Sequence, residues 1–567
     1  MTSVAKSLAL FAAIALLSAC GKRQAEAPAQ TPSASEEAAE AAPSPAITGD
    51  DLRKHIETLA SDAFEGRAPT TPGGKKARSY IAAEFARLGV EPLGEDYFQK
   101  AAMVEMTLDP SASYLRFDTP QGERRLAYKT DYVLGTKRVE KKLGFANSDV
   151  VFVGYGIVAP EYQWNDFDGV DVKGKTILIL VNDPGYATQD PALFNGNAMT
   201  YYGRWTYKFE EAARQGAAGA FIIHDTAPAA YGWGVVEGSW SGPQIDLERA
   251  DNGASRIVAE GWLTNETARQ VLSSAGLGLD DLMEKAKTRG FKAVPLDGVT
   301  ASAQLTSTIR RSEDANVVGV LKGSQAPDDY VLYMAHWDHL GVNPTEAGAD
   351  KIFNGAVDNA TGVAAILEIA EKFAAREPRP KRSILFLATT AEESGLLGSA
   401  YFAENPLVPL KDIVGGFNID ALLPAPPAKD LTVVGYGASE LEDVLAEIAA
   451  RRARRLTPDR EPEKGYFYRS DHISLAKKGV PMLYVDGGLD LREGGEEAGK
   501  ALAEDYAANR YHKPADEIDD SWNFDGMTET VEILYETGEA LAESSVWPNW
   551  YEGNEFRALR DAQRVGE

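Results

Sequence analysis

The stretch YVLYMAHWD, residues 330–338, decides the fold because it is an apolar strand that ends in polar side chains. A short run of large apolar residues favours a strand buried on both faces. His336 would lie at the tip of this strand. Asp338, two residues on, would lie on the same side of an extended chain. Since open α/β sheets form their sites at the carboxyl ends of strands, we expect a functional site here.

Apolar runs alternate with helical patterns from residue 316 onward, which is typical of an α/β fold. We predict strands at 316–321, 330–334, 383–388, 413–419, 431–434 and 482–485, and helices at 361–375, 396–404, 441–451, 473–478 and 527–541. Such alternation predicts a mixed, largely parallel sheet sandwiched by helices.

Four further short segments carry metal-binding or acid/base side chains, and several follow a predicted strand. They are VDN at 357–359, AEES at 391–394, NID at 418–420 and YHKP at 511–514. Together with HWD, they supply two histidines and three carboxylates for two zinc ions if one carboxylate bridges the ions. A further glutamate is then left over to act as a base. The segments therefore predict a two-metal hydrolase site.

Local positions suggest how some of these side chains act. The Asp338 carboxylate could accept the second imidazole N–H of His336 and so fix its tautomer. Asp358 precedes the predicted helix 361–375, where Asn359 and Thr361 could satisfy the helix-start N–H groups. A carboxylate at this position can bridge two cations, although it can also be no more than part of the helix cap.

The other histidines receive weaker predictions. We expect His55 and His224 to be surface or core residues and His339 to be peripheral, while the role of His472 stays open.

Taken in order, the five motifs resemble the co-catalytic di-zinc aminopeptidase family, which includes glutamate carboxypeptidases, glutaminyl cyclases and the transferrin receptor. The resemblance covers about 51–130 and 312–547, and it implies a zinc exopeptidase-like fold. The segment between them resembles a protease-associated domain, which is mostly β. By position, the resemblance makes His336 and Asp420 ligands of one Zn²⁺, Glu393 and His512 ligands of the other, and Asp358 the bridge between the two ions. It also implies that Glu392 is the general base and that Tyr511 polarises the scissile carbonyl.

The implied function is hydrolysis of peptides near a free terminus, most plausibly by an aminopeptidase with two Zn²⁺ per chain. The catalytic residues would be Glu392, Asp338 and Tyr511. A carboxypeptidase or dipeptidase stays an alternative, although the sequence alone identifies no cation for a free carboxylate. Glutaminyl cyclisation is a third possibility, and a non-enzymatic binding module is a fourth that zinc content would separate.

The chain of 567 residues carries a formal net charge of −27, which argues against a nucleic-acid partner because phosphate binding needs clustered Lys and Arg. Lys6, an apolar run at 8–17 and the ending LSAC at 17–20 are typical of an export signal. The ending resembles a lipobox in which Cys20 is lipidated. We therefore expect a bacterial cell-envelope protein, anchored to the outer membrane on its periplasmic side or else secreted, whose only membrane contact is the lipid.

The predicted organisation has five parts. Residues 1–20 form the signal peptide and 21–49, rich in Ala, Glu, Pro and Ser, a disordered tether. Residues 50–130 begin the catalytic domain, 131–298 form the inserted domain and 299–560 complete the catalytic domain with the metal site.

Overall fold

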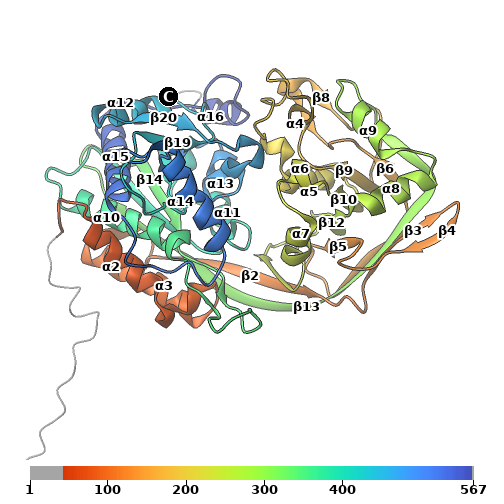
Figure 1. Cartoon of the computed structure of the whole chain (residues 1–567), viewed down its shortest axis with the longest axis horizontal. Helices are drawn as coiled ribbons and strands as arrows, with labels where there is room; N and C mark the ends of the chain where they lie inside the picture. The colour runs from red at the N-terminus through yellow and green to blue at the C-terminus, as the bar shows by residue number, and fades with distance from the viewer. Residues whose placement is uncertain (1–42, 565–567) are drawn as a thin grey trace, which may run out of the picture. The chain divides into compact units, whose positions relative to one another are not determined.

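The computed structural model describes residues 43–564 (Figure 1). The predicted signal peptide, Cys20 and most of the predicted tether lie outside these residues. Packing begins before residue 50, because Ile47 is buried in the core and the Ser44 backbone N–H donates to Glu371. The first helix, α2 (Gly49–Leu59), is capped by the Thr48 hydroxyl, which accepts from the Asp51 N–H. In residues 43–564 no helix is long and apolar enough to cross a membrane.

The main sheet is mixed with a parallel centre. Strands β21 (Met482–Gly487), β18 (Ile413–Asn418), β14 (Ala326–His336) and β17 (Arg382–Thr389) run parallel to one another in this order. Antiparallel strands flank them, with β19 (Asp430–Val434) on one side and β13 (Val294–Leu321) on the other. The predicted α/β fold is therefore confirmed.

Side chains alternate between two hydrophobic cores along the central strands. On β14, Val331, Tyr333 and Ala335 enter one core, whereas Leu332 and Met334 enter the other. The first core is covered by α2, α3 (Pro72–Arg87), α10 (Gly362–Ala374), α12 (Leu441–Arg451) and α15 (Asp525–Glu543), and the second by α11 (Leu397–Glu404) and α13 (His472–Ala476). The sheet is thus sandwiched by helices, which leaves its strand ends available for a site (Figure 1).

A second sheet organises the insert lobe, which we define as residues 114–306. Its central strands β6 (Lys142–Phe152), β9 (Thr176–Leu180), β10 (Gly219–Ile223) and β12 (Ala259–Leu263) are parallel. Helices such as α5 (Trp205–Arg214) and α8 (Asn265–Ser274) pack on it, so the lobe is α/β in character.

The boundaries of the insert differ from the predicted 131–298. Strand β3 (Tyr114–Thr119) pairs with residues 300–304 of β13, so the second sheet begins before residue 131 and ends after 298. The same β13 continues into the main sheet, where it pairs with β2 (Phe98–Leu108) and β17. Figure 1 shows β2 and β13 side by side as they join the two lobes. One continuous strand therefore belongs to both sheets.

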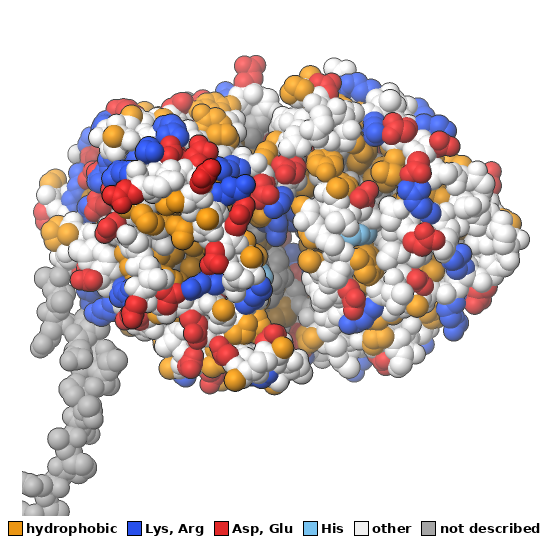
Figure 2. Space-filling model, viewed as in Figure 1, with side chains coloured by type: hydrophobic (Ala, Val, Ile, Leu, Met, Phe, Trp, Pro, Cys, Tyr) orange, Lys and Arg blue, Asp and Glu red, His pale blue; other side chains and the backbone are white. Residues whose placement is uncertain are grey.

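The surface of the molecule has mixed charge despite the acidic total. Figure 2 shows basic and acidic side chains interspersed over the face in view. Many of them pair, as Arg310 does with Glu105 and Lys292 with Asp168. The net charge of −27 is thus spread over the surface and does not form one acidic face in this view.

Candidate metal centre

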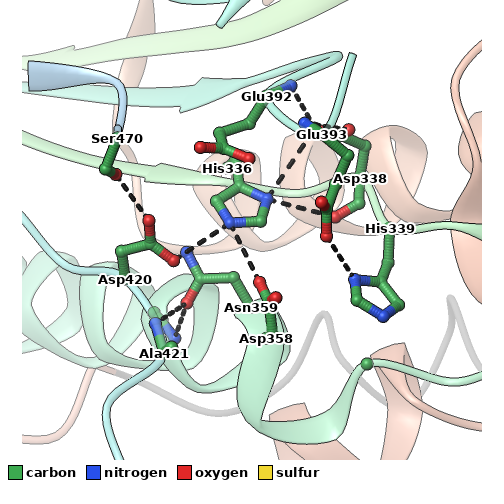
Figure 3. A network of polar contacts seen from close by, with 12 residues as sticks. His336, Asp338, His339, Asp358, Asn359, Glu392, Glu393, Asp420, Ala421 and Ser470 are labelled. Atoms are coloured by element: carbon green, nitrogen blue, oxygen red, sulfur yellow. Dashed lines mark hydrogen bonds and ion pairs between the residues drawn. The ribbon is translucent and has the colours of Figure 1, made fainter. Parts of the chain in front are cut away.

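His336, Asp358 and Asp420 converge at the carboxyl ends of the parallel strands (Figure 3). The His336 Nε2 atom lies 3.1 Å from Asp420 Oδ1 and 3.3 Å from Asp358 Oδ1. His336 ends β14 and Asp420 follows β18, which is the strand next to it. Parallel pairing of these strands therefore explains why residues so distant in sequence meet.

A second group shares Asp358 with the first. His512 Nε2 lies 3.1 Å from Asp358 Oδ2 and 3.2 Å from Glu393 Oε2. His339 Nδ1 lies 2.7 Å from Glu393 Oε1, on the other oxygen of the same carboxylate. The structure thus brings together all five predicted ligands. It also places His339 at the centre, which corrects our expectation that this residue is peripheral.

The donor set fits two divalent cations of the zinc type. Ligand atoms of His336, Asp358 and Asp420 all lie within 4.8 Å of one another, and so do those of His339, Asp358 and Glu393. Imidazole nitrogen and carboxylate oxygen are the usual zinc ligands outside thiolate sites. His339 Nε2 is buried without a hydrogen-bond partner, and the 2.7 Å contact between His339 Nδ1 and Glu393 Oε1 lacks hydrogen-bond geometry. Buried polar atoms of this kind are costly unless something binds them.

Asp338 acts differently from the prediction. The His336 Nδ1 atom lies 3.1 Å from the backbone carbonyl oxygen of Asp338, whereas the Asp338 carboxylate is 3.8 Å away, within ion-pair range but beyond a hydrogen bond. The carboxylate instead accepts from the backbone N–H groups of Glu392 (3.0 Å) and Glu393 (3.3 Å). Burial raises the pKa of Asp338 to about 7, although nearby His336 opposes the shift. Asp338 therefore fixes the loop after β17 that carries both glutamates.

Asn359 confirms its predicted capping role, whereas Thr361 does not. The Asn359 Oδ1 atom accepts from the Gly362 N–H (2.9 Å) and from the Ala421 N–H (3.1 Å). The Thr361 hydroxyl donates to the Val357 carbonyl oxygen instead of accepting from the helix start. Asn359 therefore ties the segment of Asp358 to that of Asp420 (Figure 3).

Two residues that the sequence analysis gave no role hold the Asp358 loop. The Asp516 carboxylate accepts from the backbone N–H groups of Val357 (3.0 Å) and Asp358 (3.1 Å). The Arg67 side chain is fully buried and donates to the carbonyl oxygens of Trp337 (2.9 Å) and Asp358 (3.3 Å). Arg67 also donates to the carbonyl oxygens of Asn354 and Gly355. These contacts fix Asp358 relative to His336.

Glu392 lies beside the centre, and its carboxylate appears in none of the hydrogen bonds of Figure 3. Burial raises its pKa well above the ordinary value, and the carboxylates of Asp420 and Glu393 add to the rise. Asp358 behaves in the opposite way. Burial alone would raise its pKa, but hydrogen bonds from His336 and His512 hold the pKa well below the ordinary value. The site thus places a carboxyl group with a raised pKa, that of Glu392, near a carboxylate with a lowered pKa, that of Asp358.

Tyr511 borders the centre through the ring of His512. The two rings stack with centroids 4.0 Å apart, and Tyr511 is 39% exposed. This exposure leaves the side chain accessible to a substrate.

The other histidines lie in the core, away from the two ligand groups. His472 is fully buried, with its ring centroid 4.6 Å from that of Phe467, and burial lowers its pKa to about 3. His55 bonds to Tyr80 and Glu368, and His224 to the Tyr231 carbonyl oxygen. His472 is therefore a packed aromatic residue.

A large cavity opens onto the centre. It has a volume of about 1720 Å³ and is lined by His336, Asp358, Glu392 and Asp420 from the main lobe. Arg204 and Trp240 of the insert lobe line it as well. A peptide bound in this cavity would contact both lobes.

Comparisons with known proteins agree with this chemistry. Residues 316–536 match the sequence model of Peptidase family M28. Over 88 residues (16% of this chain and 18% of the relative) the chain is 46% identical to a "Probable zinc metalloprotease" of Pyrenophora teres f. teres. Over 111 residues (19% and 13%) it is 36% identical to mouse "Aminopeptidase NAALADL1". The chain spans about a fifth or less of the length of these relatives. A solved aminopeptidase of Aneurinibacillus sp. strain AM-1 aligns at 18% identity with a TM-score of 0.45, covering 89% of this chain and 95% of that one.

Proposed function

We propose that this protein is a zinc-dependent exopeptidase, and more specifically an aminopeptidase that holds two Zn²⁺ ions. The observation that carries the proposal is the pair of ligand groups that share Asp358 at the mouth of a large cavity. The match of residues 316–536 to Peptidase family M28 supports it.

In this proposal His336 and Asp420 would hold one zinc ion, Glu393 and His512 would hold the other, and Asp358 would serve both. When bound, the ions supply Lewis acidity and lower the pKa of water to near neutrality. The Glu392 carboxylate then accepts a proton from the attacking water and delivers it to the leaving amine. The Tyr511 hydroxyl donates a hydrogen bond to the carbonyl oxygen as negative charge develops there.

An acidic side chain in the cavity favours an aminopeptidase. Asp486 lines the cavity, and its Oδ1 atom is buried without a hydrogen-bond partner. A carboxylate in this position suits the ammonium group of a peptide amino terminus, because charge-assisted hydrogen bonds are among the strongest in proteins.

The test combines metal content with substrate polarity. We expect the purified protein to hold two equivalents of zinc and to cleave dipeptides with a free amine. N-acetylated versions of the same dipeptides should be poor substrates. Cleavage of the acetylated peptides with loss of the amine requirement would instead identify a carboxypeptidase. Release of ammonia from amino-terminal glutamine without peptide cleavage would identify a cyclase.

We also propose export and lipid anchoring at Cys20, supported by the LSAC ending. Cys20→Ala should abolish incorporation of a labelled fatty acid and leave the protein either unprocessed or freely soluble, because the cysteine sulfur is the atom that would carry the lipid. Equal labelling of the variant and the natural chain would contradict the anchor. Leu17→Met, which keeps the cysteine, is the matched control.

A further inference from the structure

The cavity contains a buried cation without a partner. Arg204 directly precedes α5, lines the cavity and is only 9% exposed. Its Nε atom has no hydrogen-bond partner. Burial, together with the positive charge of the neighbouring Arg469, lowers the pKa of Arg204 to about 10. Among the described residues, no carboxylate lies within ion-pairing distance of the Arg204 guanidinium group.

Arg469 is the second cation of this pair and comes from the main lobe. It lines the same cavity and packs over the Tyr466 ring, 5.1 Å from its centroid. In the described chain it makes no ion pair. Its neighbour in sequence, Ser470, donates to Asp420 of the metal centre. Arg469 therefore lies at the edge of the centre.

Most other basic side chains of the cavity form ion pairs, and Arg256 lies near Asp246 and Glu260, where its charge favours lower pKa values for both carboxyl groups. Arg460 pairs with Glu496 at 3.2 Å, and Lys464 pairs with Glu461 at 2.6 Å. Arg204 and Arg469 thus differ from the cavity's basic side chains that have acidic neighbours, although the chain carries a net charge of −27. Like charges in a partly desolvated site repel each other, and a bound anion would relieve this cost.

Contacts between the lobes join the two segments that carry these arginines, and both side chains line the same cavity. The rings of Tyr201 and Tyr468, which lie close in sequence to Arg204 and Arg469, have centroids 6.1 Å apart. Lys477 of the main lobe pairs with Glu210 of α5 at 2.8 Å. The arginine pair is therefore built into the junction of the two lobes.

From this geometry we propose that Arg204 and Arg469 form a subsite that binds a carboxylate of the peptide substrate. A planar guanidinium group matches a carboxylate in two parallel hydrogen bonds, which gives direction as well as charge. The carboxylate is either the free carboxyl terminus of a very short peptide or the side chain of Asp or Glu. The inference rests on the proposed peptidase function and names its substrate class.

The experiment compares matched substrates and three variants. Comparing Ala-Ala with Ala-Ala-amide tests recognition of a free carboxyl terminus. Comparing Ala-Glu-amide with Ala-Gln-amide tests recognition of an acidic side chain. For Arg204→Gln and Arg469→Gln we expect KM for the preferred acidic substrate to rise about 10–100-fold, the range for a lost hydrogen bond to a charged group. Turnover of the uncharged partner should change little. Arg460→Gln, which removes a cavity arginine that is already paired, should leave the discrimination intact.

The outcomes distinguish failure of the proposed subsite from failure of the proposed peptidase function. Hydrolysis of the amides tests the peptidase, whereas discrimination between the paired substrates tests the subsite. Equal losses on charged and neutral substrates would make the arginines structural and overturn the inference. Calorimetry can also compare the affinities of the protein for N-acetylglutamate and for its diamide, a measurement that needs no turnover. The diacid should bind more tightly to the natural protein, and Arg204→Gln should remove the difference. Equal affinities for the two compounds would also overturn the inference.

Discussion

At the scale of single residues, the adjacent Glu392 and Glu393 occupy opposite electrostatic surroundings. Glu393 faces two histidines, with His339 Nδ1 at 2.7 Å and His512 Nε2 at 3.2 Å. Burial and neighbouring carboxylates instead raise the pKa of Glu392. The first environment suits a metal ligand, and the second suits a group that takes and returns a proton.

Glu392→Gln should therefore lower kcat about 10²–10⁴-fold, the usual loss for a general base, while zinc content stays at the natural level. Glu393→Gln should lose zinc together with activity. The measurement is elemental analysis alongside dipeptide kinetics. Parallel loss of zinc in both variants would show that the two roles are wrongly divided.

His339 contacts Oε1 of Glu393 and His512 contacts Oε2, so His339 should orient that carboxylate. We expect His339→Gln to weaken the affinity of the second metal about 10–100-fold, as loss of a supporting contact typically does. Competition with a chromophoric chelator would measure the affinity for each ion. His224→Gln, which changes a histidine of the insert lobe, is the control. An unchanged second affinity would show that His339 is a bystander.

The residues of the centre divide into those that sequence can predict and those that it cannot. His336 and Asp420 follow apolar strands, so strand ends alone point to them. His339 has no such signal, because it lies in a loop beyond the strand and its contact is with Glu393, 54 positions away in sequence. Asp338 was predicted to contact His336 through its carboxylate, but local spacing cannot show that the loop at 392–393 offers two backbone donors.

At the scale of elements, the loop before α10 depends on Arg67. This side chain is fully buried and reaches carbonyl oxygens on either side of the centre, including those of Trp337 and Asp358. A planar group with five N–H donors can serve several loops at once, whereas an ammonium group cannot.

Arg67→Lys should therefore lower the free energy of unfolding by about 1–3 kcal/mol, because buried carbonyl groups lose their donors. It should also weaken metal binding, since Asp358 loses its support. Urea unfolding of the metal-loaded protein measures the first effect. Arg451→Lys is the control, because Arg451 makes a solvent-exposed pair with Glu447. Equal stability of the two variants would refute the role of Arg67.

The prediction of helices and strands failed where the burial of side chains left no periodic apolar pattern in the sequence. The central strands and α10, α12 and α15 were predicted because their apolar residues recur at strand or helix spacing. Helix α14 (Gly495–Asn509) was missed, because among its residues only Gly499 is buried and no apolar stripe marks it. β13 was predicted only at its end, since its first part carries Thr, Ser and Ala that give weak periodicity.

At the scale of the whole molecule, β13 makes the insert lobe inseparable from the main sheet. Deleting residues 131–298 would leave β3 and the first half of β13 without the rest of their sheet. The role of the insert is therefore better tested by loosening its contacts with the main lobe. Lys477 and Glu210 form one of these contacts, with side chains 34% and 25% exposed.

We expect the insert lobe to wall the cavity and limit access to short peptides, because its residues line one side of the cavity. Lys477→Met removes the cation that faces Glu210 and should let the wall move away from the main lobe. Long peptides should then gain in kcat/KM relative to dipeptides, while discrimination for a carboxylate through Arg204 should fall. Lys372→Met is the matched control, because Lys372 pairs with Glu532 at 2.7 Å between α10 and α15 of the main lobe. If both variants keep the natural ratio of long to short substrates, the insert does not shape the cavity.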